Sequence, residues 1–331
     1  MSLADLVGNP QAVTRLGTAV ASGRLAHAVL LTGPDQVGKT TLSMALAAEL
    51  LAGSPWPGAL STHPDLWLED SDAESIRIDR VRAGREPGSL QEFLSLRPYA
   101  GDLRVAVLAR ADRLTEQAAN SLLKTIEEPP PGTHLLLTAR GEEGLPPTVV
   151  SRCQRISMGP VASAVVSDWL AERHGVASGI AVEAAELSAG RPGRALRLAT
   201  DPSALATELA ILDRFLAIRG GGVAAALAAA AELAPSGGAE GRERLLLDLS
   251  IWASFARDLA CLAWGAAELC RWHGRREELE RWAKTLSRSR PSEILDGLLQ
   301  AVAGVAANAQ PRLLLEALLM EIFGSDEAAA A

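Results

Sequence analysis

The first half of the chain alternates short runs of apolar residues with amphipathic stretches of helical period. An uninterrupted apolar run over residues 28–32 ends at Gly33, and shorter apolar runs follow at 66–68, 105–108 and 135–138. Strands that are apolar throughout and separated by helices are typical of a parallel sheet covered on both faces. The pattern predicts an α/β domain over residues 1–160.

Two helices of this domain have clear boundaries in the sequence. One is expected over 42–51, directly after the first strand and its glycine-rich turn. The other is expected over 116–128, with Thr115 as its N-cap and the run of three prolines from Pro129 as its stop.

Strand signals end near residue 160, and the remainder is rich in Ala and Leu with helical spacing. Helices are expected at 163–174 and 181–189 and from Arg194, which together predict a small helical domain over 161–202. A second, larger helical domain is expected over 203–331, with a last helix at 311–323 that opens with a proline. The loops expected there lie at 219–222, 236–241 and 289–291, and a frayed tail is expected at 325–331.

Charge and cysteine usage exclude several classes of protein. The 331 residues carry 32 Lys and Arg against 40 Asp and Glu, a formal net charge of −8, which disfavours an independent DNA-binding protein but not a subunit of a DNA-binding assembly. Cys153, Cys261 and Cys270 have neither disulfide nor zinc-ligand spacing, and the five histidines are scattered. No signal peptide or long apolar run is evident, so we expect a cytoplasmic protein with no membrane partner.

The sharpest motif is the phosphate-binding loop pattern G-x-x-x-x-G-K-[ST] over residues 33–40, which lies between an apolar strand and a helix. The glycines let several backbone N–H groups face one phosphate, Lys39 reaches the β- and γ-phosphates, and the Thr40 hydroxyl binds Mg²⁺ when nucleotide is present. The predicted cofactor is ATP or ADP with Mg²⁺. The expected binding residues are Gly33, Pro34, Asp35, Gln36, Val37, Gly38, Lys39, Thr40 and Thr41.

The sequence lacks the acidic pair that hydrolysis needs. In phosphate-binding-loop ATPases, carboxylates at the end of a neighbouring strand bind Mg²⁺ and orient the attacking water. After the strand at 105–108 stand Ala109 and Arg110, and Asp112 lies two positions further on. We interpret Asp112 as a solvated residue that starts a turn, so nucleotide binding without hydrolysis is expected.

Several further motifs occur in a fixed order between residues 5 and 155, with weaker ones at 188–196, 308–312 and 315–319. They are His27-Ala28-Val29-Leu30-Leu31-Thr32-Gly33, His63-Pro64-Asp65, Ala118-Ala119-Asn120-Ser121-Leu122-Leu123-Lys124-Thr125-Ile126-Glu127-Glu128-Pro129-Pro130 and Ser151-Arg152-Cys153. Together they resemble the clamp-loader subunits of bacterial DNA polymerase III, an AAA+ family. Among these subunits the chain resembles the delta-prime type more than the motor tau/gamma type.

This resemblance implies an AAA+ RecA-like domain, a helical lid and a C-terminal helical collar that oligomerises. It implies that Arg152, flanked by Ser151 and Cys153, serves as an arginine finger in the ATP site of a neighbouring subunit. A planar, permanently charged guanidinium suits that task, and an ordinary surface salt bridge is the alternative. The implied partners are the tau/gamma and delta subunits and, through the assembly, the sliding clamp and primer–template DNA. The resemblance also implies that the chain has no ATPase or polymerase activity of its own.

The chain departs from the family at three places. The interval 52–62 contains no cysteine, so the four-cysteine zinc module of many members is missing and no zinc is expected. The Asp-Glu pair of the motor subunit is replaced by Ala109 and Arg110. The lid arginine of the motor subunit aligns with Gly193, and Arg194, about 100° further round a helix, would face elsewhere.

The remaining features have structural interpretations. His63 is expected to cap or pack, Glu127 and Glu128 to end a helix in solvent, and Cys153 to pack rather than react, while the role of Lys124 stays open. The arginine clusters at 275–276 and 288–290 are too small for a nucleic-acid site. Trp252, Trp264, Trp272 and Trp282 are expected to be core or interface anchors.

Two alternatives remain from the sequence alone. One is a competent motor ATPase of the tau/gamma type, which Ala109, Arg110 and Gly193 argue against. The other is a nucleotide kinase with a phosphate-binding loop, which would leave the motif at Arg152 unexplained.

Overall fold

The computed structural model describes residues 3–71, 73–84, 87–219, 221–234, 238–307 and 309–323, without the side chains of 238–240. The chain forms two compact units. The α/β unit consists of Met1–Val166 with Gly190–Gly193, and the helical unit of Ser167–Ala189 with Arg194–Ala331. The expected division at residues 160 and 202 into three domains stays a prediction.

Five parallel strands form one sheet in the α/β unit, in the order β2-β3-β4-β1-β5. The four predicted strands are confirmed to within two residues at each end. The fifth was not predicted, because only Ile156 of its four residues is buried and its sequence, QRIS, has no apolar run. The strands are β1 Ala28–Thr32, β2 Leu66–Glu69, β3 Arg104–Leu108, β4 Thr133–Ala139 and β5 Gln154–Ser157.

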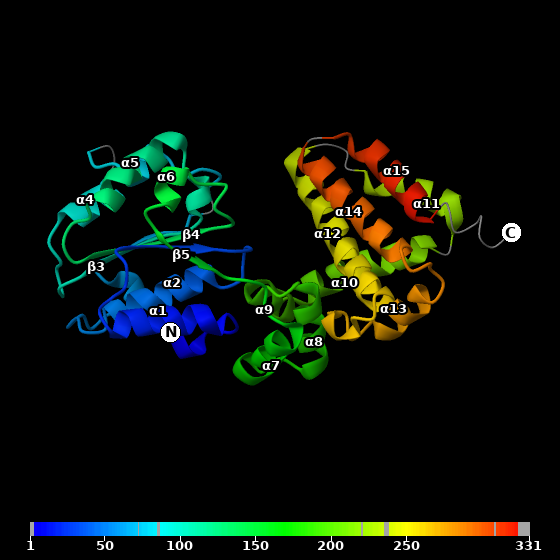
Figure 1. The fold of residues 1–331 in the computed structure, drawn as a ribbon, viewed down its shortest axis with the longest axis horizontal. Coiled ribbons are helices and arrows are strands. Elements are labelled where there is room, and N and C mark those ends of the chain that lie inside the picture. Colours follow the sequence, from blue (N-terminus) through cyan, green and yellow to red (C-terminus); the bar gives the residue numbers. More distant parts are fainter. Residues whose placement is uncertain are drawn as a thin grey trace. The chain divides into compact units, whose positions relative to one another are not determined.

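Helices cover both faces of this sheet, as Figure 1 shows. Alternate strand residues point to opposite faces. Val29 and Leu31 therefore pack with the helices α1 (Pro10–Ala21) and α2 (Lys39–Leu50). Leu30 packs with α4 (Leu90–Ser95), α5 (Glu116–Glu127) and α6 (Pro147–Val150). Because both faces are buried, every residue of β1 and β3 is buried, which explains the continuous apolar runs in the sequence.

The helices of the first half follow the predicted pattern. The expected helix at 42–51 begins three residues earlier at Lys39, because Gly38 is its left-handed N-cap. The N-cap assignment of Thr115 is confirmed, since its hydroxyl oxygen accepts the N–H of Ala118 at 3.3 Å. The elements are η1 Leu3–Asp5, α1 Pro10–Ala21, α2 Lys39–Leu50, η2 Leu60–Thr62, α3 Ile78–Val81, α4 Leu90–Ser95, η3 Ala111–Arg113, α5 Glu116–Glu127, α6 Pro147–Val150 and α7 Ser163–His174.

The rest of the described chain is helical, as predicted. The helices expected at 163–174 and 311–323 have those bounds, and the one expected at 181–189 spans Ser178–Leu187. The remaining elements are α8 Ser178–Leu187, α9 Pro192–Thr200, α10 Pro202–Arg219, α11 Gly222–Leu233, α12 Gly238–Ala263, η4 Ala267–Leu269, α13 Arg276–Ala283, α14 Arg290–Ala306 and α15 Pro311–Phe323.

Two of the expected loops are partly wrong. Helix α12 already begins at Gly238, within the loop expected at 236–241, and Pro291 lies in the first turn of α14, where its missing N–H costs nothing. Asn308 and the expected tail at 325–331 lie outside the described residues.

Aromatic side chains fill the core of the helical unit. Phe215 stacks on Trp252 with ring centroids 4.8 Å apart, and Trp282 stacks on Phe323 at 6.2 Å. Trp252, Trp282 and likewise Trp272 are core anchors as predicted.

Trp264 differs from the other three tryptophans. It is 58% exposed, beneath the guanidinium of Arg288 at 4.5 Å. None of the described helices is long and apolar enough to cross a membrane.

One buried carboxyl joins two elements of the helical unit. Glu186 on α8 is 2% exposed and accepts the N–H of Gly274, in the turn before α13, at 2.9 Å. Burial raises the pKa of Glu186 to about 7, the N–H groups of Gly274 and His273 oppose the rise, and the carboxylates of Asp258 and Glu183 add to it.

The stability of the helical unit should therefore depend on pH through Glu186. Folded Glu186 keeps its proton up to about pH 7, but the unfolded side chain loses it near 4.5, so wild-type stability falls as the pH rises across this interval. Glu186→Gln keeps an acceptor for Gly274 without the charge. The free energy of unfolding of this variant should equal that of wild type at low pH and exceed it by about 3 kcal/mol above neutral pH. The measurement is urea unfolding of both proteins at a series of pH values.

Glu172→Gln is the matched control, because Glu172 is exposed on α7 of the same unit and is not among the groups that shift the pKa of Glu186. Its effect should not change with pH. A gain for Glu186→Gln that is the same at every pH would contradict the assignment.

Candidate functional site

The phosphate-binding loop follows β1 and opens α2. Gly33 has φ +145°, and a Cβ there would lie 2.1 Å from the carbonyl oxygen of Met158, so only glycine fits. Gly38 has φ +105° and caps α2. The loop therefore has the backbone that its glycines predict, and its conformation depends on the strand β5 and the residue that follows it.

Lys39 is turned back onto its own loop. Its Nζ donates to the carbonyl oxygens of Gly33 at 2.6 Å and Pro34 at 2.7 Å, and the side chain is 7% exposed. Burial lowers the pKa of Lys39, and the carboxylates of Asp35 and Asp112 counteract part of this change.

Arg140 lies beside the loop and was missed by the sequence analysis. It directly follows β4, and its Nε and a terminal nitrogen lie 2.7 Å and 2.6 Å from Oδ2 of Asp35. This hydrogen bond raises the pKa of Arg140. The signal that could have found it was topological. The carboxyl ends of parallel strands meet at one edge of the sheet, so a charged residue directly after any of these strands is a candidate for the site.

Arg110 occupies the position of the missing acid and faces away from the loop. Its backbone is left-handed, with φ +54°, and its guanidinium donates to the carbonyl oxygens of Asp70 and Ser71 and to the Asp70 carboxylate at 3.2 Å. Arg110 thus ties the end of β3 to the segment after β2. Neither it nor the buried Ala109 offers a carboxylate to a metal or to water.

Asp112 lies in a turn as predicted, but it is only partly exposed and not fully solvated. It lies in η3, and its Oδ1 is buried with no hydrogen-bond partner among the described residues. Its negative charge acts on both Lys39 and Arg140. The charge of Asp112 therefore acts on the cations of the loop together with that of Asp35, although Asp112 stands outside the position of the catalytic pair.

The residues of the loop fit a nucleotide phosphate, and their surroundings do not fit hydrolysis. The turned backbone, Lys39 and the partly exposed residue Thr40 are the groups that would hold a phosphate and its Mg²⁺. Gly193 lies against the loop, because its N–H donates to the carbonyl of Gln36 at 3.0 Å and a Cβ there would be 3.2 Å from that oxygen. Arg194 faces elsewhere as predicted, buried in an ion pair with Glu208 at 2.6 Å.

Arg152 lies on the surface in the turn between α6 and β5. Its side chain is 40% exposed, and a terminal nitrogen lies 2.7 Å from Oε1 of Glu127 at the end of α5, while another donates to the carbonyl of Thr148. Glu127 is therefore an ion-pair partner and not only a solvated helix end. Cys153 beside it is buried, which raises the pKa of its thiol to about 11 and suits a packing residue rather than a nucleophile.

The His63-Pro64-Asp65 motif is structural. The His63 ring lies 2.9 Å from the Ser54 hydroxyl and accepts the N–H of Asp65. Asp65 is fully buried, accepts the N–H groups of Tyr99 and Ala100 at 2.6 Å and 2.7 Å, and lies 3.6 Å from the Arg104 guanidinium. The motif therefore anchors the segment that precedes β3.

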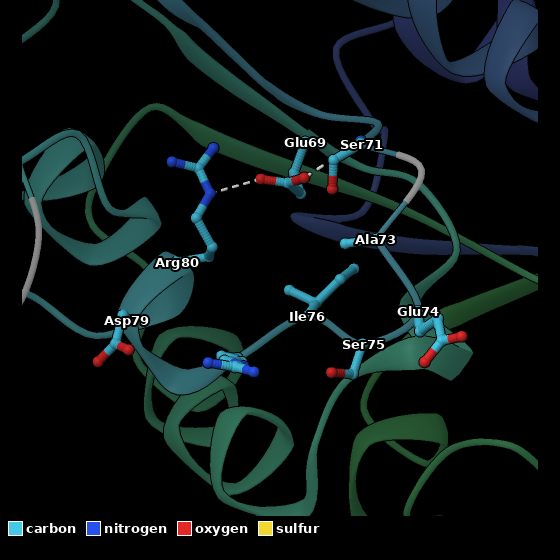
Figure 2. Close-up of a pocket in the computed structure, with 9 residues that line it drawn as sticks. Glu69, Ser71, Ala73, Glu74, Ser75, Ile76, Asp79 and Arg80 are labelled. Atoms are coloured by element: carbon cyan, nitrogen blue, oxygen red, sulfur yellow. Dashed lines mark hydrogen bonds and ion pairs between the residues drawn. The ribbon is translucent and has the colours of Figure 1, made fainter.

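Figure 2 shows a separate pocket of about 630 Å³ at the carboxyl end of β2. Its lining contains no residue of the phosphate-binding loop, and the buried carboxylate of Glu69 is paired with Arg80 inside it at 2.5 Å. Among the described residues, no cluster of His, Cys, Asp or Glu could hold a metal ion.

Comparison with known proteins places the α/β unit near one group of proteins. Residues 8–162 match the family model described as DNA polymerase III, delta subunit. The chain is 36% identical over 160 residues to DNA polymerase III subunit delta' of Pseudomonas aeruginosa, covering 44% of this chain and 47% of that protein. It is 32% identical to subunit delta' of Escherichia coli, in a match that covers 54% of this chain and 55% of that protein. It is 28% identical to subunit tau of the same organism, in a match that covers 46% of this chain and 24% of that protein.

The chain spans about half the length of the curated delta-prime relatives that it matches. Over this part it is related to the delta-prime subunits, and to tau and gamma subunits at lower identity, which confirms the resemblance that its motifs predict. One similar solved structure is a gamma subunit-related protein of Thermotoga maritima, with 17% identity and a TM-score of 0.44, where the match covers 94% of this chain and 99% of that one. Another is RuvB of the same organism, with 21% identity and a TM-score of 0.44, where the match covers 60% of this chain and 62% of that one.

Asp65 provides a test of the structural interpretation of its motif. Asp65→Ala leaves the Arg104 guanidinium buried without its carboxylate and removes the acceptor of two N–H groups. We expect a loss of about 3–5 kcal/mol in the free energy of unfolding of the α/β unit, measured by calorimetry. The exposed Asp102→Ala should cost less than about 0.5 kcal/mol. Equal effects of the two variants would refute the interpretation.

Proposed function

We propose that this chain is a delta-prime subunit of a bacterial clamp loader, the assembly that loads the sliding clamp onto primed DNA during replication. The observation that carries the proposal is the replacement at the end of β3: a phosphate-binding loop is kept, and Arg110 stands where an ATPase has its acid. The kinship to delta-prime subunits supports it. We place the chain in the cytoplasm, with tau/gamma and delta subunits as partners and the clamp and primer–template DNA reached through the assembly.

The proposal includes binding of ATP or ADP with Mg²⁺ at residues 33–41 without hydrolysis. Backbone N–H groups of the loop and the Lys39 ammonium would hold the phosphates, and the Thr40 hydroxyl would be the protein ligand of Mg²⁺. The Mg²⁺ would neutralise phosphate charge. Neither Ala109 nor Arg110 supplies a base or a metal ligand for a water, so the bound nucleotide would persist.

The proposal further assigns Arg152 to the ATP site of a neighbouring motor subunit. Its present partner, Glu127, is 46% exposed, and an ion pair between two exposed side chains is worth about 1 kcal/mol or less. Arg152 can therefore exchange this carboxylate for the phosphate oxygens of a neighbour at little cost. The helical unit, with its aromatic core, would supply the collar through which the subunits associate.

The isolated chain should not turn over ATP, because it lacks a hydrolytic carboxylate pair. The measurement is the steady-state ATPase rate of the purified chain, with and without primed DNA, beside its mixture with the motor subunits. Turnover that appears only in the mixture is the expected result. Appreciable turnover by the chain alone would instead support a motor subunit.

Arg152→Ala tests the trans assignment. In the reconstituted assembly we expect hydrolysis at the site that receives Arg152 to fall by about 10³-fold or more, and clamp loading to fall with it. The matched control is Arg155→Ala, because Arg155 is also exposed and paired with a carboxylate, Glu142. It should leave both rates unchanged, and unchanged rates for Arg152→Ala would show that its salt bridge with Glu127 is its whole role.

A further inference from the structure

An acidic residue stands inside the phosphate-binding loop itself. The carboxylate of Asp35 lies on the side of the loop where Arg140 approaches, and its Oδ2 is 2.7 Å and 2.6 Å from two guanidinium nitrogens. Its other oxygen lies 4.0 Å from the Nζ of Lys39. One side chain of the loop therefore contacts both nearby cations.

These two cations are the groups that a phosphate would use. Two nitrogens of the Arg140 guanidinium hold one carboxylate oxygen of Asp35, and the same two donors could hold a phosphate oxygen. The Lys39 ammonium is further occupied by the carbonyl oxygens of Gly33 and Pro34. The chain thus satisfies both positive charges with its own acceptors.

The same closed loop is held from a second side. The hydrogen bond from Gly193 fixes the carbonyl of Gln36, a residue with left-handed backbone, φ +61°. Within the α/β unit, the loop is therefore held by its lysine, by Arg140 and by Gly193. Asp112 is the other carboxylate whose charge acts on Lys39 and Arg140.

We infer that Asp35 occupies the place of a phosphate and is the residue that sets the nucleotide affinity of this loop. The inference rests on the proposed nucleotide site at residues 33–41. A di- or triphosphate must displace the Asp35 carboxylate from Arg140 and Lys39 and then tolerate its negative charge nearby. Asp35 therefore determines how readily this subunit takes up nucleotide, separately from the absent acidic pair that determines hydrolysis.

The test is a fluorescence titration of the full chain with N-methylanthraniloyl-ADP and Mg²⁺. Asp35→Asn keeps the size of the side chain and removes the charge that pairs with Arg140 and approaches Lys39, so the Kd should fall about tenfold or more below that of wild type. Asp35→Ser is a second variant with the same expectation. Adding Lys39→Ala to Asp35→Asn should abolish the gain.

Glu49→Gln is the matched control, because it removes the same charge from an exposed position at the far end of α2. Its Kd should stay within about twofold of wild type. If Glu49→Gln tightens binding as much as Asp35→Asn, the effect is one of net charge and the inference is wrong.

Two further outcomes would overturn the inference in distinguishable ways. Equal Kd values for wild type and both Asp35 variants would refute the inference and leave the nucleotide site standing. No binding by any of them would refute the nucleotide site together with the inference. Membership in a clamp loader is tested separately, by size-exclusion chromatography of the chain mixed with tau/gamma and delta subunits, where a complex should form.

Discussion

The carboxyl ends of β1, β3 and β4 meet at one edge of a parallel sheet, and the chemistry of this chain depends on the charges at that edge. The phosphate-binding loop follows β1, Arg110 and Asp112 follow β3, and Arg140 follows β4. Parallel pairing leaves no choice in this arrangement, since each strand must deliver its next residues to the same side. A substitution after any one strand therefore changes the electrostatics of the whole site.

At this edge, charged side chains pair with one another and connect separate segments of the fold. Arg110 ties two strand ends together, and Asp35 holds Arg140 and approaches Lys39. Each arrangement pairs a charge with a partner from the chain itself. The same principle operates at Asp65, where a buried carboxylate is paired with Arg104 and anchors the segment before β3.

The helical unit is stabilised in a different way. Its core consists of stacked aromatic rings around Phe215, and its buried acids each have a local partner: Glu208 pairs with Arg194, and Glu186 accepts the N–H of Gly274. Among the described residues, the groups that shift the pKa of Glu186 include no cation, and burial raises this pKa to about 7. The unit is thus built for packing, and the charged chemistry of the chain lies in the α/β unit.

The sequence by itself determined the layered α/β fold, because strands buried on both faces must be apolar throughout, and it determined the phosphate-binding loop, because only glycine adopts its backbone. It also showed that the acidic pair is missing at Ala109 and Arg110. Only the tertiary structure brought Arg140 to Asp35, which is 105 positions away, turned Arg110 from the site and buried one carboxylate oxygen of Asp112. β5 escaped prediction because only Ile156 of its four residues is buried, which leaves no apolar run. Periodicity reports the burial of a local segment, whereas the pairing of charges distant in sequence is decided by which strand ends the sheet places side by side.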